Sequence, residues 1–166
     1  AALQSALNNL NQWCMDWGMD LHPDKCVVIH FGKNNPENDY FIGKNKLCAV
    51  DGARDLGVHI TMDVDSTEHV NKVAKKAHAV LSQLRRATSL RDASTFAKLY
   101  TVYVRPLLEA AAPAWNPMKR ESVSTLEKVQ RRALRMIPGL SHLSYEERLE
   151  SLGMESLENR RHRGDM

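Results

Sequence analysis

The sequence is poor in cysteine and has no long apolar runs. Its three cysteines, Cys14, Cys26 and Cys48, are odd in number and form no Cys-x-x-Cys pair, so we expect neither disulfides nor a structural zinc site. No segment approaches the ~20 consecutive apolar residues of a membrane helix, and the N-terminus has no signal-peptide pattern. These absences favour an intracellular protein, in the nucleus or the cytoplasm, without a membrane partner.

Common catalytic motifs are also missing. The chain contains no P-loop, no Gly-x-Ser-x-Gly elbow, no His-Glu-x-x-His and no adjacent Asp-Asp pair. Asp63-Val-Asp65 only imitates a carboxylate pair for a metal ion. His22, Cys26 and His30 have the spacing of ligands on one helix face, but Pro23 and the β-branched residues that follow argue against a helix there. We therefore predict no metal site.

The charge of the chain is distributed unevenly. The composition, with 43% hydrophobic and 26% charged residues, is that of an ordinary globular protein. Residues 1–65 hold 5 Lys and Arg against 9 Asp and Glu, whereas residues 66–166 hold 18 against 11. The split indicates two functional parts, of which the basic one is a candidate for binding phosphates. The alternative is a set of solvated helix faces.

The hydrophobic pattern predicts a mixed first part. Residues 1–17 repeat apolar side chains at helical spacing, and Gly18 is placed to end the helix. The pattern then changes to short β-rich segments at 25–31, 40–42, 46–50 and 56–61, with turns at 43–45 and 51–52. Together these segments predict a small antiparallel meander beside the helix. The predicted core side of that helix comprises Leu3, Leu7, Leu10, Trp13 or Cys14, and Trp17.

From residue 66 onward the pattern is helical. Helices are predicted over 66–87, from a cap at Asp92 to a kink or end at Pro106, over 120–137, and near 144–151 and 155–163. The fold class is therefore α+β, with a small antiparallel sheet and a packing helix over 1–63 and an all-helical bundle over 64–166. The predicted inward residues of the bundle are Val70, Val73, Ala74, Ala77, Leu81, Leu84, Phe96, Leu99, Tyr100, Tyr103, Leu107, Val123, Leu126, Val129, Ala133 and Ile137.

Several motifs follow one another in a familiar order along almost the whole chain. The first is the stretch from Trp13 to Cys26, which closes on His-Pro-Asp-Lys-Cys, and the second is Arg54-Asp-Leu-Gly-Val58. In that order and spacing the chain resembles the C-terminal part of the reverse transcriptase of non-LTR (LINE- or jockey-like) retrotransposons. Further similar stretches are 99–109, 113–117, 126–133, 144–153 and the closing 160–165.

The resemblance implies that residues 1–63 are the end of the polymerase palm and that 64–166 are the thumb and its extension. Lys25 then falls at the palm lysine proposed to protonate the leaving pyrophosphate, although a solvated lysine is the alternative. Arg54-Asp-Leu-Gly-Val58 falls at the primer grip, where Gly57 lets the backbone approach a sugar-phosphate closely. The nucleic-acid-binding residues expected in this hairpin and on the basic helix faces are Arg54, Leu56, Gly57, Val58, Lys72, Lys75, Lys76, Arg86, Lys128, Arg131, Arg132 and Arg135.

The aspartate pair that holds Mg²⁺ in such enzymes would lie upstream of residue 1, so we expect this chain alone to be inactive and to carry no cofactor. Both of its ends have the pattern of a longer protein's interior. The first hypothesis is a reverse transcriptase fragment that grips an RNA template and a DNA primer strand beside the missing N-terminal palm and fingers. The alternatives are a non-enzymatic helical module that binds nucleic acid or protein, and a decayed relic without function.

Overall fold

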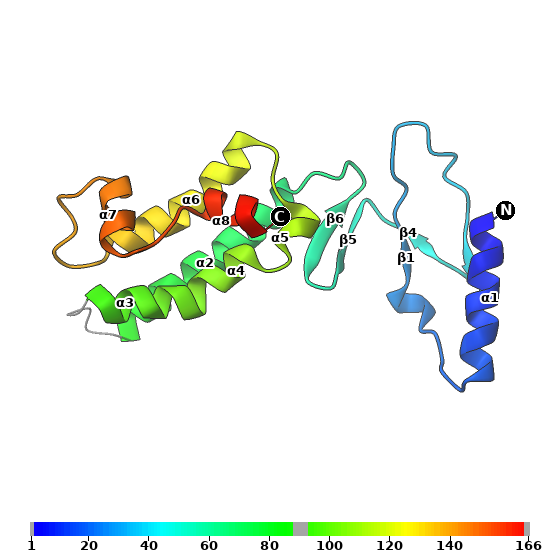
Figure 1. The fold of residues 1–166 in the computed structure, drawn as a ribbon. Helices are drawn as coiled ribbons and strands as arrows, with labels where there is room; N and C mark the ends of the chain where they lie inside the picture. The colour runs from blue at the N-terminus through cyan, green and yellow to red at the C-terminus, as the bar shows by residue number, and fades with distance from the viewer. Residues whose placement is uncertain (1, 88–92, 165–166) are drawn as a thin grey trace. The chain divides into compact units, whose positions relative to one another are not determined.

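The protein has a mixed α+β fold in two compact units. In a computed structural model that describes residues 2–87 and 93–164, the units comprise residues 1–65 and 66–166. The first unit combines one helix with short strands, and the second is helical (Figure 1). This division lies two residues from the one that the sequence pattern predicts, between 63 and 64.

The first helix, α1 (Ala2–Asp16), ends where its sequence predicts. Gly18 adopts a left-handed φ of 64°, which lets the Met19 amide donate a 2.8 Å hydrogen bond to the Cys14 carbonyl. The Gln4 side chain joins this helix to a strand, because its amide group donates to and accepts from the backbone of Phe41, both at 2.9 Å. Gln4 thus meets the edge of that strand as a neighbouring strand would.

The strands of the first unit form separate pairs. β2 (Phe41–Ile42) pairs antiparallel with β3 (Asn45–Lys46), and β5 (Gly52–Asp55) pairs antiparallel with β6 (Val58–Thr61). β1 (Val27–Val28) pairs instead in parallel with β4 (Cys48–Ala49). The predicted small antiparallel meander is therefore confirmed only for two separate antiparallel pairs, and it is wrong in joining the strands into one sheet. The segment between β1 and β4 is long enough for the crossover that a parallel pair requires.

The predicted strand over 25–31 is also shorter than expected. Pro23 opens a 3₁₀ turn, η1 (Pro23–Lys25), because its ring fixes φ near the helical value and its missing N–H is not needed at a helix start. The Cys26 amide closes this turn on the Pro23 carbonyl at 3.0 Å. Within this segment, Val27 and Val28 are the residues that pair with another strand.

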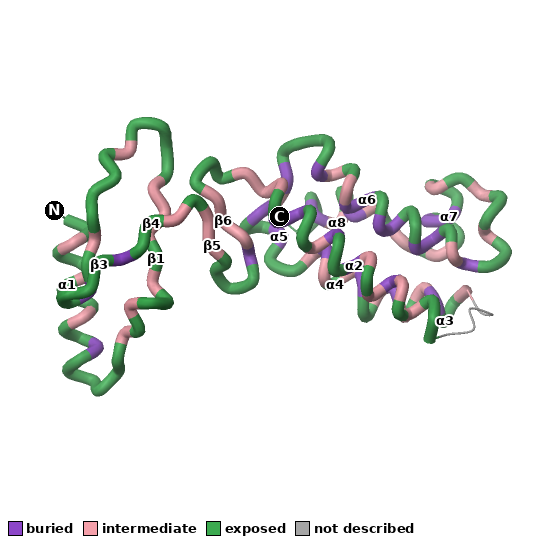
Figure 2. The backbone as a smooth tube through the Cα atoms, turned by 180° about the vertical axis from the view of Figure 1, so that it is seen from behind, coloured by how far each residue is buried: buried purple, intermediate pink, exposed green. Residues whose placement is uncertain are grey.

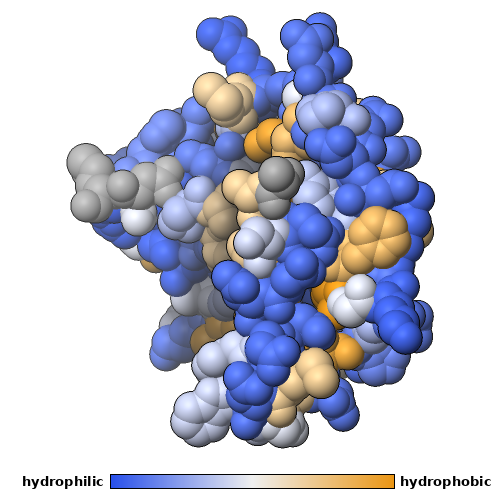
Figure 3. All heavy atoms as spheres, turned by 90° about the vertical axis from the view of Figure 1, so that its right-hand side faces the viewer, coloured by the Kyte–Doolittle hydropathy of each residue, from blue (hydrophilic) through white to orange (hydrophobic). Residues whose placement is uncertain are grey.

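Most of the apolar face of α1 is exposed, so the prediction that it forms core is wrong within this chain for four of its residues, while Leu7 is half-buried. Cys14 is buried, but Leu3, Leu10, Trp13 and Trp17 are 54%, 45%, 50% and 70% exposed. Exposed residues dominate the first unit in Figure 2, whereas buried residues gather in the helical unit. Figure 3 shows apolar side chains at the surface among hydrophilic ones. The small strand pairs offer α1 too little apolar surface to cover this face.

The second unit is built on two long helices, α2 (Thr67–Ala87) and α6 (Arg120–Arg135), which pack against each other. The two helices run in the same direction. Near their starts, Thr67 Oγ1 lies 3.4 Å from Ser122 Oγ, and further along both helices the charge of Arg132 lowers the pKa of His78. The described helices beside them are α3 (Ala93–Leu99), the π-helical η2 (Tyr100–Val104), α4 (Arg105–Glu109), α5 (Ala112–Trp115), α7 (Tyr145–Ser151) and α8 (Leu157–Gly164).

The predicted core of α2 and α6 is confirmed. Every residue expected to face inward on these two helices is buried or half-buried. Pro138-Gly139 follows the end of α6, and Gly139 has a left-handed φ of 82°. Ser144 begins α7 with a capping box, in which its hydroxyl accepts from the Glu147 amide and the Glu147 carboxylate accepts from the Ser144 amide. The predicted cap at Asp92 lies outside the described residues.

The predicted inward face before Pro106 is wrong at Tyr103, which is 55% exposed. In η2 the Arg105 amide donates to the Tyr100 carbonyl, five residues back, which is the π-helical pattern. The extra residue in this turn rotates the helix, so the buried positions after Tyr100 are Val104 and Leu108. A period of 3.6 residues cannot anticipate this shift.

The chain remains helical past Pro106 as far as Glu109 and then turns sharply. Ala111 adopts a left-handed φ of 54° between α4 and α5. The turn brings the Trp115 indole N–H to the Ala110 carbonyl at 2.8 Å and buries the Trp115 ring. The ring also packs against His69 of α2, at 4.7 Å between centroids. Trp115 thus fills space beside a run of three alanines.

We expect Ala111→Gly to stabilise the helical unit. A residue with a Cβ is strained at positive φ by ~1–2 kcal/mol, and glycine gives back part of this gain as backbone entropy. The expected net gain in the free energy of unfolding is about 0.5–1 kcal/mol, measured by urea denaturation. Ala110→Gly is the matched control, because Ala110 has φ of −57° and should gain nothing. Equal effects of the two substitutions would contradict the strain at Ala111.

Candidate nucleic-acid interface

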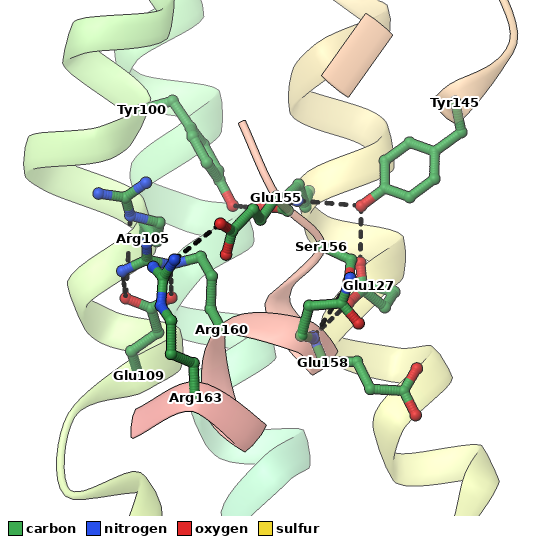
Figure 4. Close-up of polar contacts among 12 residues, drawn as sticks. Tyr100, Arg105, Glu109, Glu127, Tyr145, Glu155, Ser156, Glu158, Arg160 and Arg163 are labelled. Carbon is green, nitrogen blue, oxygen red and sulfur yellow. Dashed lines mark hydrogen bonds and ion pairs between the residues drawn. The ribbon is translucent and has the colours of Figure 1, made fainter. Parts of the chain in front are cut away.

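A buried chain of hydrogen bonds joins α6 to η2, α7 and the start of α8 (Figure 4). The fully buried Gln130 accepts from the Tyr100 hydroxyl at 2.7 Å through its Oε1. Its Nε2 donates to the Tyr145 hydroxyl at 3.0 Å and to the Glu155 carbonyl at 2.9 Å. These contacts satisfy the amide of Gln130 and fix the rotation of α6.

The network continues from Tyr145 to Glu127 on the next turn of α6. The Tyr145 hydroxyl donates to Glu127 Oε2 at 2.6 Å, and the Glu158 amide donates to Glu127 Oε1 at 2.8 Å. Burial raises the pKa of the Tyr145 hydroxyl well above its usual range, and the bond to Glu127 adds to this shift. Both oxygens of Glu127 are thus used inside the unit, and one of them anchors the first turn of α8.

Ion pairs hold α8 from its other side. The Arg160 guanidinium donates through Nε and a terminal nitrogen to both carboxylate oxygens of Glu109 on α4, and Arg105 lies 3.8 Å from the same carboxylate. The bonds to Glu109 raise the pKa of Arg160. Arg163 pairs with Glu155 at 2.7 Å. Because Arg160 and Glu109 are only about a quarter exposed, this bidentate pair is better protected from solvent than a typical surface pair.

These contacts shape a groove of about 830 Å³ along α6, beside α8 and the segment that follows α5. Its basic members come from α6 and α8, whereas its acidic members are Glu127 and Glu158. The Arg131 guanidinium lies 4.5 Å from the centroid of the Tyr145 ring, a cation–π contact that limits its motion. The residues lining the groove are Asn116, Pro117, Met118, Arg120, Val123, Ser124, Glu127, Lys128, Arg131, Glu158, Arg161 and His162.

The basic residues predicted on α2 and α6 are all exposed. Lys128 and Arg131 line the groove, whereas Arg132 lies on the side of α6 that faces His78 of α2. On α2, Lys72 is held by Glu68 at 2.7 Å in a surface pair of small energetic value. The predicted basic face of α6 is therefore divided between the groove and the side toward α2. The exposed basic residues are Lys72, Lys75, Lys76, Arg86, Lys128, Arg131, Arg132 and Arg135.

The predicted primer-grip segment is a hairpin tip. Arg54 lies exposed one residue before the end of strand β5, and Leu56 and Gly57 form the turn with φ of 44° and 93°. Two left-handed residues are typical of the tight turns that suit twisted hairpins, where asparagine and glycine are the usual occupants. Leu56 is 98% exposed in this unfavourable conformation. Val58, by contrast, is buried, so a ligand at the tip would meet its backbone rather than its side chain.

Two further residues considered in the sequence analysis, Lys25 and Asp63, lie in the first unit. Lys25 lies exposed in η1, within the first unit. The carboxylate of Asp63 accepts from Thr61 Oγ1 at 2.6 Å and from the Asp65 amide at 3.2 Å, and the Thr61 bond is the main cause of its lowered pKa. Asp63 thus serves a local turn. Across residues 2–87 and 93–164, no three His, Cys, Asp or Glu side chains are grouped to hold a metal ion.

Sequence reasoning missed three basic residues of the groove, Arg120, Arg161 and His162. The run of basic residues near the C-terminus was a signal, but a short charged helix gives no indication of which surface it will face. Arg161 is almost completely buried, unlike its neighbours. Within the part of the chain that the structure describes, no helix is both long and apolar enough to cross a bilayer.

Comparison with known proteins adds one relative. The chain is 27% identical over 119 residues to a Caenorhabditis elegans protein described as "Uncharacterized protein B0403.1". The matched segment covers 70% of this chain and 60% of that protein. No protein-family profile matches the chain. No solved structure matches it either.

We expect Gln130→Met to destabilise the helical unit by about 2–4 kcal/mol, because it leaves the buried hydroxyl of Tyr100 and the Glu155 carbonyl without partners. Urea denaturation followed by circular dichroism measures the loss. Gln83→Met on the exposed face of α2 is the matched control and should change the free energy of unfolding by less than about 0.5 kcal/mol. Similar losses for both variants would show that the network contributes little.

We expect stability to depend on pH through His78. Burial lowers the pKa of His78, and the charge of Arg132 lowers it further, so His78 binds a proton less readily in the folded chain than in the unfolded chain. The unfolded chain takes up the proton near its ordinary pKa of about 6.5, so stability falls as pH drops below that value. His78→Leu should therefore flatten the decline in the free energy of unfolding between about pH 7 and 5. The difference between the two proteins at pH 8 measures packing alone, and an unchanged slope in His78→Leu would contradict this role.

Proposed function

We propose that the chain is the rear part of a reverse transcriptase of the non-LTR retrotransposon type, comprising the end of the palm and the thumb. In this proposal it holds an RNA template paired with a DNA primer strand through backbone contacts. Nucleotide addition by two Mg²⁺ ions belongs to the upstream palm, and this chain alone does not polymerise. In this proposal the chain acts inside the cell, in the nucleus or the cytoplasm.

One observation carries the proposal: the exposed surfaces of α2 and α6 are strongly basic. The two helices hold ten Lys and Arg against three Glu, of which Glu127 is buried and Glu68 is paired with Lys72. Because α2 and α6 run in parallel and pack together, they form one layer of two helices, and this layer carries all of these basic residues. Lys and Arg side chains on such a layer contact phosphates without reading the base sequence.

Two features of the first unit support the same proposal. The exposed tip from Arg54 to Val58 presents an exposed cation, an exposed Leu56 and a glycine in a turn, which suits a close approach to a sugar-phosphate. The exposed apolar face of α1 is the kind of surface that further palm strands would cover.

A second candidate function is a non-enzymatic module that binds protein. The observation that favours it is again the exposed apolar face of α1, where Trp13 and Trp17 are 50% and 70% exposed. Tryptophan is enriched at the centres of protein interfaces. This alternative expects an interaction that responds weakly to salt, whereas the reverse transcriptase proposal expects a steep response.

The test replaces Lys72, Lys75 and Lys76 with Glu and measures binding of a fluorescent RNA–DNA hybrid at several salt concentrations. Each lost phosphate contact removes roughly 0.7–0.9 from the slope of log K against log salt, so the slope should fall by about 2–3. A triple replacement of Lys33, Lys44 and Lys46 by Glu is the matched control, with the same change in charge on exposed residues of the first unit. An unchanged slope in the α2 variant would rule out α2 as a contact surface.

A further inference from the structure

The groove along α6 is lined by more basic than acidic side chains. Its two carboxylates are unequal, because Glu127 is engaged with Tyr145 and the Glu158 amide, while Glu158 lies exposed in the first turn of α8. An excess of cations in a groove raises the local concentration of anions. The basic residues of the lining are Arg120, Lys128, Arg131, Arg161 and His162.

We propose that this groove binds the phosphodiester backbone of one nucleic-acid strand. The inference rests on the proposed function and deepens it, since it assigns the strand to one side of α6. Arg120 and Lys128 are separated by eight residues, or about 12 Å along the helix. One strand of a duplex places three to four phosphates over roughly this length. Arg131 stands almost one turn beyond Lys128 on the same groove wall.

The groove is held in shape before any ligand arrives. Glu127 anchors the start of α8 through the Glu158 amide, and Glu109 anchors the middle of α8 through Arg160. Stacking on Tyr145 restrains the Arg131 guanidinium. A restrained arginine loses less side-chain entropy when it binds a phosphate than a free lysine does.

The line of cations favours nucleic acid over an acidic peptide. Beyond the groove, α6 continues with the exposed Arg135, which lies one turn after Arg131 on the same side of the helix, so positive charge follows the helix for more than three turns from Arg120. A strand with a charge on every nucleotide can use the whole line, and a cluster of a few carboxylates cannot.

The experiment measures anisotropy of a fluorescent 12-nucleotide oligouridine with the full chain in about 0.1 M salt. Replacing Arg120 and Lys128 together by Gln should lower the affinity about 10- to 30-fold and reduce the salt slope by roughly 1.4, the value for two contacts to a single strand. Both side chains are exposed, so the variant should keep the circular dichroism spectrum of the parent chain. Glu158→Gln removes the exposed acid of the same groove and should raise the affinity.

Single lysines give the matched control. Lys128→Gln should weaken binding several-fold more than Lys98→Gln, which removes an exposed lysine from α3. Equal effects of these two variants would overturn the groove while leaving the proposed function standing. If the unmodified chain bound neither the oligonucleotide nor the RNA–DNA hybrid, both the groove and the proposed function would be overturned. Tighter binding of hexaglutamate than of a six-nucleotide RNA would assign the groove to an acidic peptide instead.

Discussion

The arrangement of the helical unit depends on one buried amide, that of Gln130. Apolar side chains pack through contacts that tolerate small rotations, but a buried polar group must meet its partners with good geometry. Gln130 meets Tyr100, Tyr145 and the Glu155 backbone from three separate segments of the chain. Its contacts fix the rotation of α6, and that rotation decides which of the basic residues of α6 line the groove and which face α2.

The two units differ in how completely they bury their apolar side chains. The helical unit buries large side chains such as Phe96, Leu126 and Leu134 almost completely. In the first unit, the buried apolar residues are Cys14, Ile42, Leu47 and Val58, and most of the large side chains of α1 remain in contact with solvent. The first unit therefore leaves much of its apolar surface in contact with solvent, whereas the helical unit has a core of its own.

Helical periodicity was a good guide wherever a helix packs on another with a regular turn. The inward faces of α2 and α6 follow from it because both helices keep their register throughout. The exposure of Tyr103 was not predicted because one π-helical turn shifts the inward face of the helix. A local sequence pattern does not specify such a turn. The parallel pairing of β1 with β4 escaped because two-residue strands carry almost no register information.

The candidate site was only partly visible in the sequence. The basic residues of α2 and α6 could be identified because they recur opposite an apolar stripe. Gln130 falls within the apolar arc of α6, beside Val129 and Ala133, and its polarity there was the available sign of a buried network. The groove itself could not be foreseen, since it depends on where the Glu109 and Glu127 carboxylates draw α8.

The parallel course of α2 and α6 has an electrostatic consequence of its own. Two helices side by side in the same direction align their dipoles, so their positive ends meet at one end of the layer and their negative ends at the other. Glu68 and Glu121 stand in the first turns, while Arg85, Arg86, Arg132 and Arg135 stand near the last. These charges oppose the dipoles and lessen the repulsion between the two helices. Dissolved salt screens that compensation, so in the proposed complex the ionic strength that releases a polyanion would also loosen the two helices that bind it.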